Sequence, residues 1–250
     1  MNRSTKNALV TGAGKRIGAE IAKSLADNGW NVVVHYHNSI NEVSDLVREI
    51  KKSKVDCIAV KCDFNDPKKV DRFFSEISSA FGKFSLLINN ASAFINDKFD
   101  EFSLESFIYN NNVNYIASAI LIHKFFNQNI FNEDNKGNII NILDYCIYSY
   151  PDNFYSYTLS KMAQKNLIEV NAKLLAPFVR INGIALGAVM KSDKQSEENF
   201  IRSYKQSPLQ INTTVAEVLS TIKYIVRSRS LTGAIIPIDS GKRYTNGLFI

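Results

Sequence analysis

The 250-residue sequence predicts an α/β fold in which a doubly wound parallel sheet of about seven strands carries helices on both faces. Two observations lead to this fold class. Short apolar runs typical of buried strands alternate with helical patterns along the chain, and the first run leads through a glycine-rich turn into a helix. Such alternation gives parallel strands joined by right-handed crossovers. No repeat or linker is visible in the sequence, so residues 1–250 are expected to form one domain.

The first strand, residues 8–11, leads into the spacing G-x-G-x-x-x-G at Gly12, Gly14 and Gly18. Glycines let the backbone approach a pyrophosphate, and the N-terminus of the following helix offers unpaired N–H groups to it. The spacing is one residue longer than the usual dinucleotide fingerprint, and a tight turn that binds nothing is the alternative. Because these glycines stand between a strand and a helix, as the fingerprint requires, we expect a dinucleotide site.

The second strand, residues 31–37, is followed by residues that bear on the choice of dinucleotide. An acidic residue here would hydrogen-bond the ribose hydroxyls of NAD and repel a 2′-phosphate. The sequence instead offers His37, Asn38 and Ser39, together with Arg16 in the glycine loop. All four side chains can hydrogen-bond a phosphate, so NADPH is predicted over NADH. Taken alone, His37 is more simply explained as a histidine satisfied within its strand.

The alternation continues through the middle of the chain. In order, the patterns indicate a helix at about 40–52, a strand at 55–61, a helix opened by Asp66-Pro67 and a strand at 85–88. Asp66 suits the N-cap and Pro67 the first helical position. The segment Asn89-Asn90-Ala91-Ser92-Ala93-Phe94 leaves the C-terminal end of the fourth strand. Strand order reverses between the first and fourth strands in such sheets, so this segment should border the ligand crevice.

The second half of the chain supplies the remaining elements. They are helical patterns from 103 and over 113–131, a strand at 138–143, a helix at 156–175, a strand at 178–182, a helix at 215–226 and a strand at 234–238. Residues 188–207 are polar and weakly periodic. Long segments of this kind in compact domains are often lids, so we expect a substrate lid there.

Composition limits the function classes. The net charge is +6, but Lys and Arg are interleaved with Asp and Glu and form no block of five, so no nucleic-acid partner is expected. The cysteines, Cys57, Cys62 and Cys146, lack disulfide or metal-ligand spacing, which favours a reduced cytoplasmic setting and no metal site. The sequence has no apolar signal segment and no run of 18 apolar residues, so no membrane partner is expected.

Chemistry is concentrated in residues 144–161. Tyr157 and Lys161 are four residues apart, so on a helix they share a face, where the ammonium is expected to lower the pKa of the phenol. That would make the tyrosine a usable acid. Asp144 directly follows the strand at 138–143, and a carboxylate at a strand's C-terminal end is a frequent site position in α/β folds. Tyr-x-x-x-Lys alone is also common on ordinary exposed helices, and its weight comes from the nucleotide motifs that precede it.

Together these motifs resemble those of the short-chain dehydrogenase/reductases over essentially the whole chain. The matching residues are Thr11-Gly12 with Gly18, Asp63, Asn89-Asn90-Ala91, Asn114, Tyr157 with Lys161, Asn182, Gly187 and Thr232-Gly233. The resemblance implies a Rossmann fold in which Lys161 holds the nicotinamide ribose and Asn114 anchors a water of the proton relay. The implied cofactor contacts are Gly12, Gly14, Lys15, Arg16, Ile17, Gly18, His37, Asn38, Ser39, Asp63, Phe64, Asn89, Ala91, Ser92, Tyr157, Lys161 and Gly187.

Within that family the chain is most similar to the pteridine reductases and the related dihydromonapterin reductases. The features that carry this narrower resemblance are Arg16 in place of a glycine, His35-Tyr36-His37-x-Ser39, the segment Asn89 to Phe94, and Asp144 in place of a serine. Three residues depart from the family. Asn38 stands where some relatives have an arginine for the 2′-phosphate, Leu186 where proline usually precedes the glycine, and Ser240 where the closing motif has glycine.

The expected reaction is NADPH-dependent reduction of a dihydropterin, such as dihydrobiopterin or dihydromonapterin, or of dihydrofolate. A carboxylate at 144 accepts hydrogen bonds and suits the N–H groups of a heterocycle better than a ketone. The catalytic residues are then Asp144, Tyr157, Lys161 and Asn114, and the substrate contacts are Arg16, Ser92, Phe94, Asp144 and Tyr157. Alternatives are a reductase of another carbonyl substrate, such as a 3-oxoacyl thioester, and a non-catalytic NADP-binding regulator. Relatives pair their two long helices across a dimer interface, usually within a tetramer, so a homotetramer is expected. The apolar residues expected on these helices are Val113, Ile116, Ile120 and Leu121 on one and Met162, Leu167 and Leu174 on the other.

Overall fold

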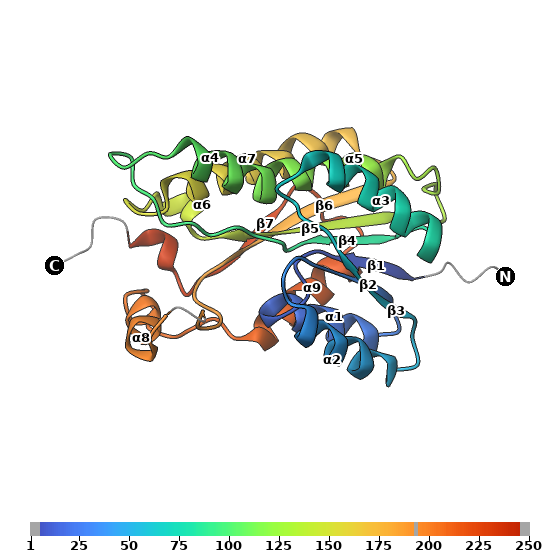
Figure 1. Ribbon diagram of the computed structural model, residues 1–250, viewed down its shortest axis with the longest axis horizontal. Coiled ribbons are helices and arrows are strands. Elements are labelled where there is room, and N and C mark those ends of the chain that lie inside the picture. The colour runs from blue at the N-terminus through green and yellow to red at the C-terminus, as the bar shows by residue number, and fades with distance from the viewer. Residues whose placement is uncertain (1–5, 193–194, 246–250) are drawn as a thin grey trace.

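The structure is a computed structural model that describes residues 6–192 and 195–245. Within these residues, seven strands form one sheet in the order β3-β2-β1-β4-β5-β6-β7 (Figure 1). They are β1 (Asn7–Val10), β2 (Asn31–Tyr36), β3 (Cys57–Lys61), β4 (Leu86–Asn89), β5 (Gly137–Asp144), β6 (Val179–Leu186) and β7 (Ile235–Ile238). Every neighbouring pair is parallel. The predicted doubly wound parallel sheet is therefore confirmed.

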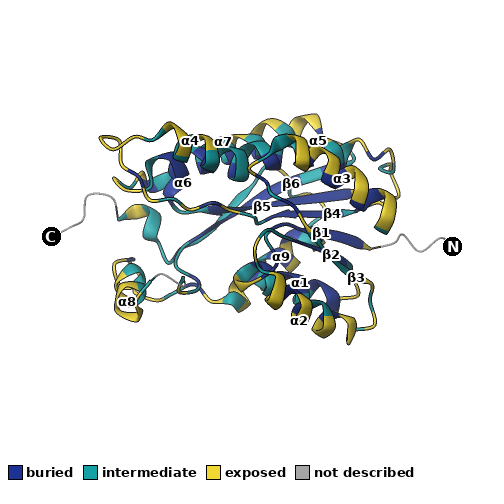
Figure 2. Ribbon diagram, in the orientation of Figure 1, coloured by how far each residue is buried: buried dark blue, intermediate teal, exposed yellow. Residues whose placement is uncertain are grey.

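Helices cover both faces of the sheet. On one face lie α1 (Arg16–Asp27), α2 (Ile40–Lys51) and α9 (Val215–Arg227), and on the other lie α3 (Pro67–Phe81), α4 (Leu104–Asn111), α5 (Ala117–Phe126) and α7 (Tyr155–Leu174). Strand residues alternate between two apolar clusters, as Leu9 and Val10 do on β1. Figure 2 shows the result, buried strands between helices whose outer faces are exposed. Burying both faces explains why the strands read as continuous apolar runs.

The ligand crevice is fixed by the place where strand order reverses. β1 has β2 on one side and β4 on the other, with Val10 opposite both Val34 and Ile88. Connections from β1 and β4 leave toward opposite faces, which opens a crevice at their carboxyl ends. β5 lies next to β4 and delivers Asp144 to the same edge. The predicted nucleotide and catalytic segments therefore meet at one edge of the sheet.

Helix starts follow local sequence signals. Asp66 caps α3, its Oδ1 accepting hydrogen bonds from the backbone N–H groups of Lys68 at 3.0 Å and Lys69 at 3.3 Å, and Pro67 is the first helical residue. This start is the one the sequence predicts. Thr214 and Glu217 form a capping box at the start of α9. The helix expected over 113–131 instead ends at Phe126, beyond which Asn127 closes the last turn on His123.

The long helix before β5 contains a single π-helical turn. The turn, η1 (Asn112–Ile116), joins α4 to α5 and includes Asn114. Wide turns of this kind inside α-helices occur frequently at functional sites. The sequence pattern predicts two helices here but gives no signal for the π-turn that joins them.

The segment expected to form a lid contains one short helix, α8 (Glu197–Lys205), none of whose residues is buried. Residues 193 and 194 of that segment lie outside the described part of the chain. In Figure 1 α8 stands apart from the layered body, beside the chain that leaves β6. None of the described helices is both long enough and apolar enough to cross a membrane.

Candidate active site

The glycine loop after β1 leaves no room for side chains at two positions. Gly12 has a φ of +59°, and a Cβ placed on it would lie 2.7 Å from Cα of Ala91. A Cβ on Gly18 would lie 2.3 Å from the carbonyl oxygen of Gly12. The N-cap of α1 is Lys15, whose side chain has no acceptor for the first N–H groups of the helix. The loop thus combines close backbone approach with a helix N-terminus, which fits a pyrophosphate.

Hydrogen bonds join this loop to the loop after β4. Oγ1 of Thr11 accepts from the backbone N–H groups of Asn90 and Ala91, each at 2.9 Å. In return, Nδ2 of Asn90 donates to the carbonyl oxygens of Thr11 and Gly12, each at 3.0 Å. The two loops that border the crevice therefore form one hydrogen-bonded unit. Thr11 and Asn90 belong to the motifs that carry the family resemblance, and these bonds give both side chains a structural role.

His35 also holds the glycine loop, and the sequence analysis does not identify it as a site residue. Its Nδ1 accepts from the N–H of Gly12 at 3.0 Å, and its Nε2 lies 3.1 Å from the carbonyl oxygen of Cys62, to which it donates. The ring stacks on Phe64 with centroids 3.8 Å apart. Burial lowers the pKa of His35 to about 4, so the ring is neutral at physiological pH. Only the neutral tautomer with its proton on Nε2 satisfies both hydrogen bonds.

The residues expected around the 2′-phosphate lie at the ends of β2 and β3. Nε2 of His37 is 3.9 Å from Oδ1 of Asp63, and Ser39 is the N-cap of α2. A Cβ on Gly14 would lie 2.9 Å from Cβ of Ser39, so the glycine loop touches this corner. Arg16 extends elsewhere, its Nη2 donating 2.9 Å to the carbonyl oxygen of Met190 in the expected lid segment. The structure therefore brings His37, Ser39 and the glycine loop close to one another. It places the side chain of Arg16 elsewhere, against the expected lid segment.

Tyr157 and Asp144 are in direct contact. Oη of Tyr157 donates to Oδ2 of Asp144 at 3.2 Å, and Oδ1 of Asp144 accepts from the N–H of Cys146 at 2.9 Å. Burial raises the pKa of Asp144, and burial together with the neighbouring carboxylate raises the pKa of Tyr157 well above its usual range. The expectation that Lys161 lowers the pKa of the phenol is therefore wrong for this structure. Burial outweighs an ammonium that lies 5.8 Å from the ring centre.

Lys161 is buried beneath Tyr157 and tied to the sheet. Its Nζ donates to the carbonyl oxygen of Ile142 on β5 at 3.0 Å and to Oε1 of Gln164 at 3.2 Å. Burial lowers the pKa of Lys161 to about 8, while the charge of Asp144 opposes the change. A lysine with this pKa exchanges its proton close to neutral pH.

Asn114 joins the substrate-side loop to α7 from within the π-turn. Its Oδ1 accepts from the N–H of Ala93 at 2.7 Å, and its Nδ2 donates to the carbonyl oxygen of Ala93 at 3.0 Å and to Oγ of Ser160 at 2.8 Å. The side chain is fully buried. Asn114 therefore lies beside α7 and fixes the loop after β4, and the water that the family resemblance implies for it stays a prediction.

An aromatic group borders the site on the substrate side. Phe94 is 59% exposed and stacks on Phe154 with ring centroids 4.2 Å apart. Its ring meets that of Tyr157 edge to face, with centroids 4.6 Å apart. The hydroxyl of Ser92 donates to the carbonyl oxygen of Ala93 at 3.2 Å in the same loop. Phe94 thus offers an exposed ring next to Tyr157, and sequence reasoning missed Phe154, its packing partner.

Asp97 supplies the missing cap of the catalytic helix. Phe154 occupies the N-cap position of α7 with a left-handed φ of +63° and has no capping side chain. Oδ1 of Asp97 accepts from the N–H of Ser156 at 3.0 Å, and its Oδ2 binds the Ser156 hydroxyl. The backbone carbonyl of Asp97 also accepts from the N–H of Tyr155 at 3.1 Å. The sequence gives no sign of this contact, because the cap comes from a residue 59 positions earlier.

Three expected cofactor contacts have other structural roles. Asn89 is buried and donates from Nδ2 to Oδ1 of Asn141 at 2.8 Å, because its strand position faces the helix layer. Phe64 packs on His35, so its ring supports the loop rather than lining the crevice. A Cβ on Gly187 would lie 2.8 Å from Cα of Asp239, so this glycine allows close approach to the chain after β7. The side chains of Asn89 and Phe64 thus support the site from within, and the cofactor contacts expected of these three residues stay predictions.

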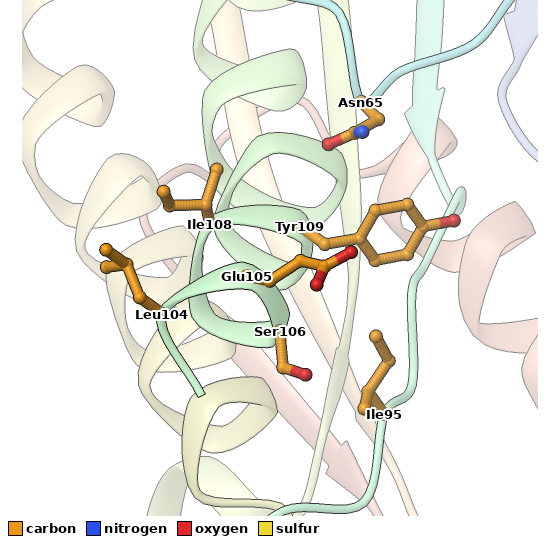
Figure 3. Close-up of a pocket in the computed structure, with 7 residues that line it drawn as sticks. All are labelled: Asn65, Ile95, Leu104, Glu105, Ser106, Ile108 and Tyr109. Atoms are coloured by element: carbon orange, nitrogen blue, oxygen red, sulfur yellow. The ribbon is translucent and has the colours of Figure 1, made fainter. Parts of the chain in front are cut away.

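A hollow opens beside the crevice, between α4 and the loops after β3 and β4. Figure 3 shows it, with Tyr109 and Asn65 facing its upper part and Ile95 across from Ser106. Nδ2 of Asn112 donates to the carbonyl oxygen of Asn65 at 2.9 Å, which ties the π-turn to this rim. The lining includes neither Tyr157 nor Asp144. Among the described residues, no group of His, Cys, Asp or Glu is arranged to hold a metal ion, and the three cysteines are buried and free.

A glycine loop at a strand-order reversal and a group of half-buried Asp144 with buried Tyr157 and Lys161 at the same edge are typical of a nucleotide-dependent oxidoreductase. Comparison with known proteins agrees. The family model described as short chain dehydrogenase matches residues 6–200. The chain belongs to the short-chain dehydrogenase/reductase family, whose members use NAD(P), and it is an oxidoreductase of that family.

Individual relatives span nearly the whole chain. A dihydromonapterin reductase of Enterobacter sp. (strain 638) is 26% identical over 241 residues, covering 96% of this chain and 98% of the relative. The 3-oxoacyl-[acyl-carrier-protein] reductase FabG of Staphylococcus aureus (strain Mu50) is 26% identical over 246 residues, with the same coverage. The crystal structure of FolM alternative dihydrofolate reductase 1 from Brucella canis, complexed with NADP, is 32% identical with a TM-score of 0.90, covering 96% and 95% of the two chains.

Proposed function

We propose that this chain uses NADPH to reduce a C=N bond in a dihydropterin such as dihydrobiopterin or dihydromonapterin, with dihydrofolate as a further candidate. The observation that carries the proposal is the contact between Tyr157 and Asp144. An ionised carboxylate only accepts hydrogen bonds, so at this position it suits the ring and amino N–H groups of a pterin. A ketone offers only an acceptor and gains nothing from it.

The chain's own residues supply the proton and the orientation. NADPH, when bound, supplies a hydride to the ring carbon. Tyr157 keeps its proton at neutral pH and gives it to the ring nitrogen, so its O–H bond breaks as the new N–H bond forms. Lys161, with a pKa of about 8, then returns a proton to the phenolate. Phe94 presents its exposed ring beside Tyr157, where it can stack on the pterin.

The choice of NADPH is supported by the corner at the ends of β2 and β3. His37, Asn38 and Ser39 follow β2, and none of them is acidic. A 2′-phosphate there meets the hydrogen-bond donors of these three side chains, while the carboxylate at this corner, Asp63, follows β3 and lies 3.9 Å from Nε2 of His37. The relative from Brucella canis was solved with NADP, which agrees with this choice.

A second candidate is reduction of a 3-oxoacyl thioester, because the FabG relative is as similar in sequence as the dihydromonapterin reductase. Asp144 argues against it, since it lacks the O–H with which a serine binds a ketone oxygen. The third alternative, a non-catalytic NADP-binding regulator, does not suit a chain that retains Asp144, Tyr157 and Lys161 in mutual contact range.

The test measures the rate of NADPH oxidation, through the loss of its absorbance, with each of several candidate substrates. Dihydrobiopterin, dihydromonapterin, dihydrofolate and an acetoacetyl thioester are compared at equal concentrations with NADPH and with NADH. The proposal expects at least one dihydropterin to give the highest kcat/KM, and NADPH to be preferred. Faster reduction of the thioester than of every pterin would overturn the pterin proposal and leave only the family activity.

A further inference from the structure

Gln164 is a fully buried glutamine beside the catalytic lysine, and neither the family motifs nor the proposed reaction uses it. It follows Lys161 by three residues on α7, so the two side chains are neighbours on the helix surface. Nζ of Lys161 donates to Oε1 of Gln164 at 3.2 Å. An ammonium only donates hydrogen bonds, so this contact fixes the amide with its oxygen toward the lysine.

The other end of the amide continues the chain of hydrogen bonds. Nε2 of Gln164 donates to Oγ of Ser118 on α5 at 2.9 Å, and Oγ of Ser118 donates to the backbone carbonyl of Asn114 at 3.0 Å. Ser118 is 4% exposed and Asn114 is fully buried. Every donor in this chain points the same way, from the ammonium toward the π-turn. Aligned donors of this kind polarise and strengthen one another in a dry environment.

We infer that Gln164 is a positioning residue that, through Ser118, holds the ammonium of Lys161 against β5 and links it to Asn114. Three elements are joined by this route: α7 with Tyr157 and Lys161, the π-turn, and the substrate-side loop that Asn114 clamps at Ala93. Among the described residues, Ile142 and Gln164 accept two of the three N–H groups of Lys161, which leaves the third for the cofactor or water.

Burying a glutamine is costly unless both ends of the amide are paired, so an apolar residue would pack here more simply. The paired glutamine instead gives the buried ammonium a neutral acceptor. Hydrogen bonding to a charged form favours that form, so Gln164 should keep Lys161 protonated to higher pH than burial alone allows. The titratable groups that act on Lys161 from its surroundings are Asp144 at the end of β5 and Cys146 in α6 (Cys146–Ser149), with Tyr157 on the same helix.

The experiment titrates Lys161 directly in the protein without substrate. Lysine labelled with ¹³C at Cε is followed by NMR from neutral to alkaline pH, and the Lys161 signal is assigned from its loss in Lys161→Ala. The wild-type midpoint is expected near 8, and Gln164→Met, which keeps the length but removes the acceptor, should lower it by about one pH unit. Gln164→Glu keeps the shape and adds charge, so it should raise the midpoint. Ser118→Ala should lower it by less than Gln164→Met does.

Gln128 provides a matched control far from the site. It is also buried, and it bonds the backbone N–H of Phe84 at 2.8 Å and the carbonyl oxygens of Phe84 and Phe125 at 3.1 and 2.8 Å. Gln128→Met should lower the melting temperature without moving the Lys161 midpoint. An unchanged midpoint in Gln164→Met, or in Gln164→Glu should the first variant not fold, would overturn the inference. The inference rests on the proposed function only for the catalytic use of Lys161, and this titration does not depend on which substrate is reduced.

Discussion

The phenol of Tyr157 and the carboxylate of Asp144 share a hydrogen bond of 3.2 Å at the carboxyl end of β5. Tyr157 is buried and Asp144 is half-buried, and burial is the main reason that the pKa of each is raised. The phenol therefore keeps its proton at neutral pH. In the proposed reaction a substrate nitrogen takes this proton while Asp144 orients it and accepts hydrogen bonds from the substrate, so the two side chains should act as one unit.

This coupling predicts the behaviour of Asp144→Ser. The change restores the hydroxyl of ordinary family members and removes the acceptor, so dihydropterin turnover should fall by about 10²-fold or more. Tyr157→Phe should cost at least as much, and the double variant should lose little beyond the worse single one, because groups that act as a unit are not additive. NADPH binding, followed by its fluorescence, should barely change. Undiminished pterin reduction in Asp144→Ser would exclude the proposed role.

The lowered pKa of His35 predicts that the free energy of unfolding decreases as the pH falls below about 6.5. Its folded pKa of about 4 lies below the ordinary 6.5, so between these values the unfolded chain binds a proton that the folded chain does not. Its contribution is fully present above pH 6.5 and is lost as pH falls toward 4, by about 3 kcal/mol in total. Urea unfolding at a series of pH values measures the slope.

His35→Gln keeps a donor and an acceptor but removes the titrating ring, so its stability should depend less on pH across this window. Asp144, whose folded pKa is raised, contributes in the opposite direction and is common to both proteins, so the difference isolates the histidine. Parallel stability curves for the two proteins would contradict the assignment.

Much of the site was predictable, because strand ends and glycine turns are local signals. The strand before Asp144 and the helix through Tyr157 are each legible in sequence, and parallel topology brings their ends together. Contacts between segments far apart in the chain could not be predicted from the sequence. Asp97 caps α7 across 59 residues, and His35 on β2 joins the loops after β1 and β3. The face that a strand residue takes decides the role of Asn89 in the same way.

The apolar residues that motivate the expected interface divide between core and surface, and the interface itself stays a prediction. The sequence expectation placed Val113, Ile116, Ile120, Leu121, Met162, Leu167 and Leu174 on an interface. In the structure Leu121 is buried and Val113, Ile120, Met162 and Leu167 pack against the core, while Leu174 is 64% exposed. Other apolar residues of α4 and α7 are exposed instead, namely Leu104, Ile108 and Val170. Helical periodicity marks an apolar stripe but not whether core or partner covers it.

We predict a homotetramer, with the exposed apolar residues of α4 and α7 in one interface. Light scattering should give four times the chain mass of 28.2 kDa. Ile108→Glu combined with Leu174→Glu places charges in that interface and should yield smaller species. Ile40→Glu, at a residue 59% exposed on the opposite helix layer, is the control and should leave assembly unchanged. A wild-type monomer at micromolar concentration would refute the prediction.

Arg16 and Ser240 both stand where the family has glycine, and both keep the left-handed backbone that glycine favours, with φ of +55° and +54°. A side chain in this conformation costs roughly 1–2 kcal/mol, which glycine would relieve in part, since it also gains freedom in the unfolded chain. Ser240→Gly should therefore raise stability by up to about 1 kcal/mol and leave cofactor binding unchanged. That outcome is measured by urea unfolding and by titration with each cofactor.

Arg16→Gly separates backbone strain from recognition at Arg16. It relieves the same left-handed φ, but it also removes the guanidinium and its 2.9 Å hydrogen bond to Met190, so stability should change little. An arginine that meets the 2′-phosphate forms a charge-assisted pair, so the free energy of NADPH binding should weaken by an amount on the order of 1–3 kcal/mol while that of NADH binding stays unchanged. Ser240→Gly controls for the backbone effect. An equal loss of affinity for both cofactors would mean that Arg16 shapes the glycine loop and the lid segment without recognising the phosphate.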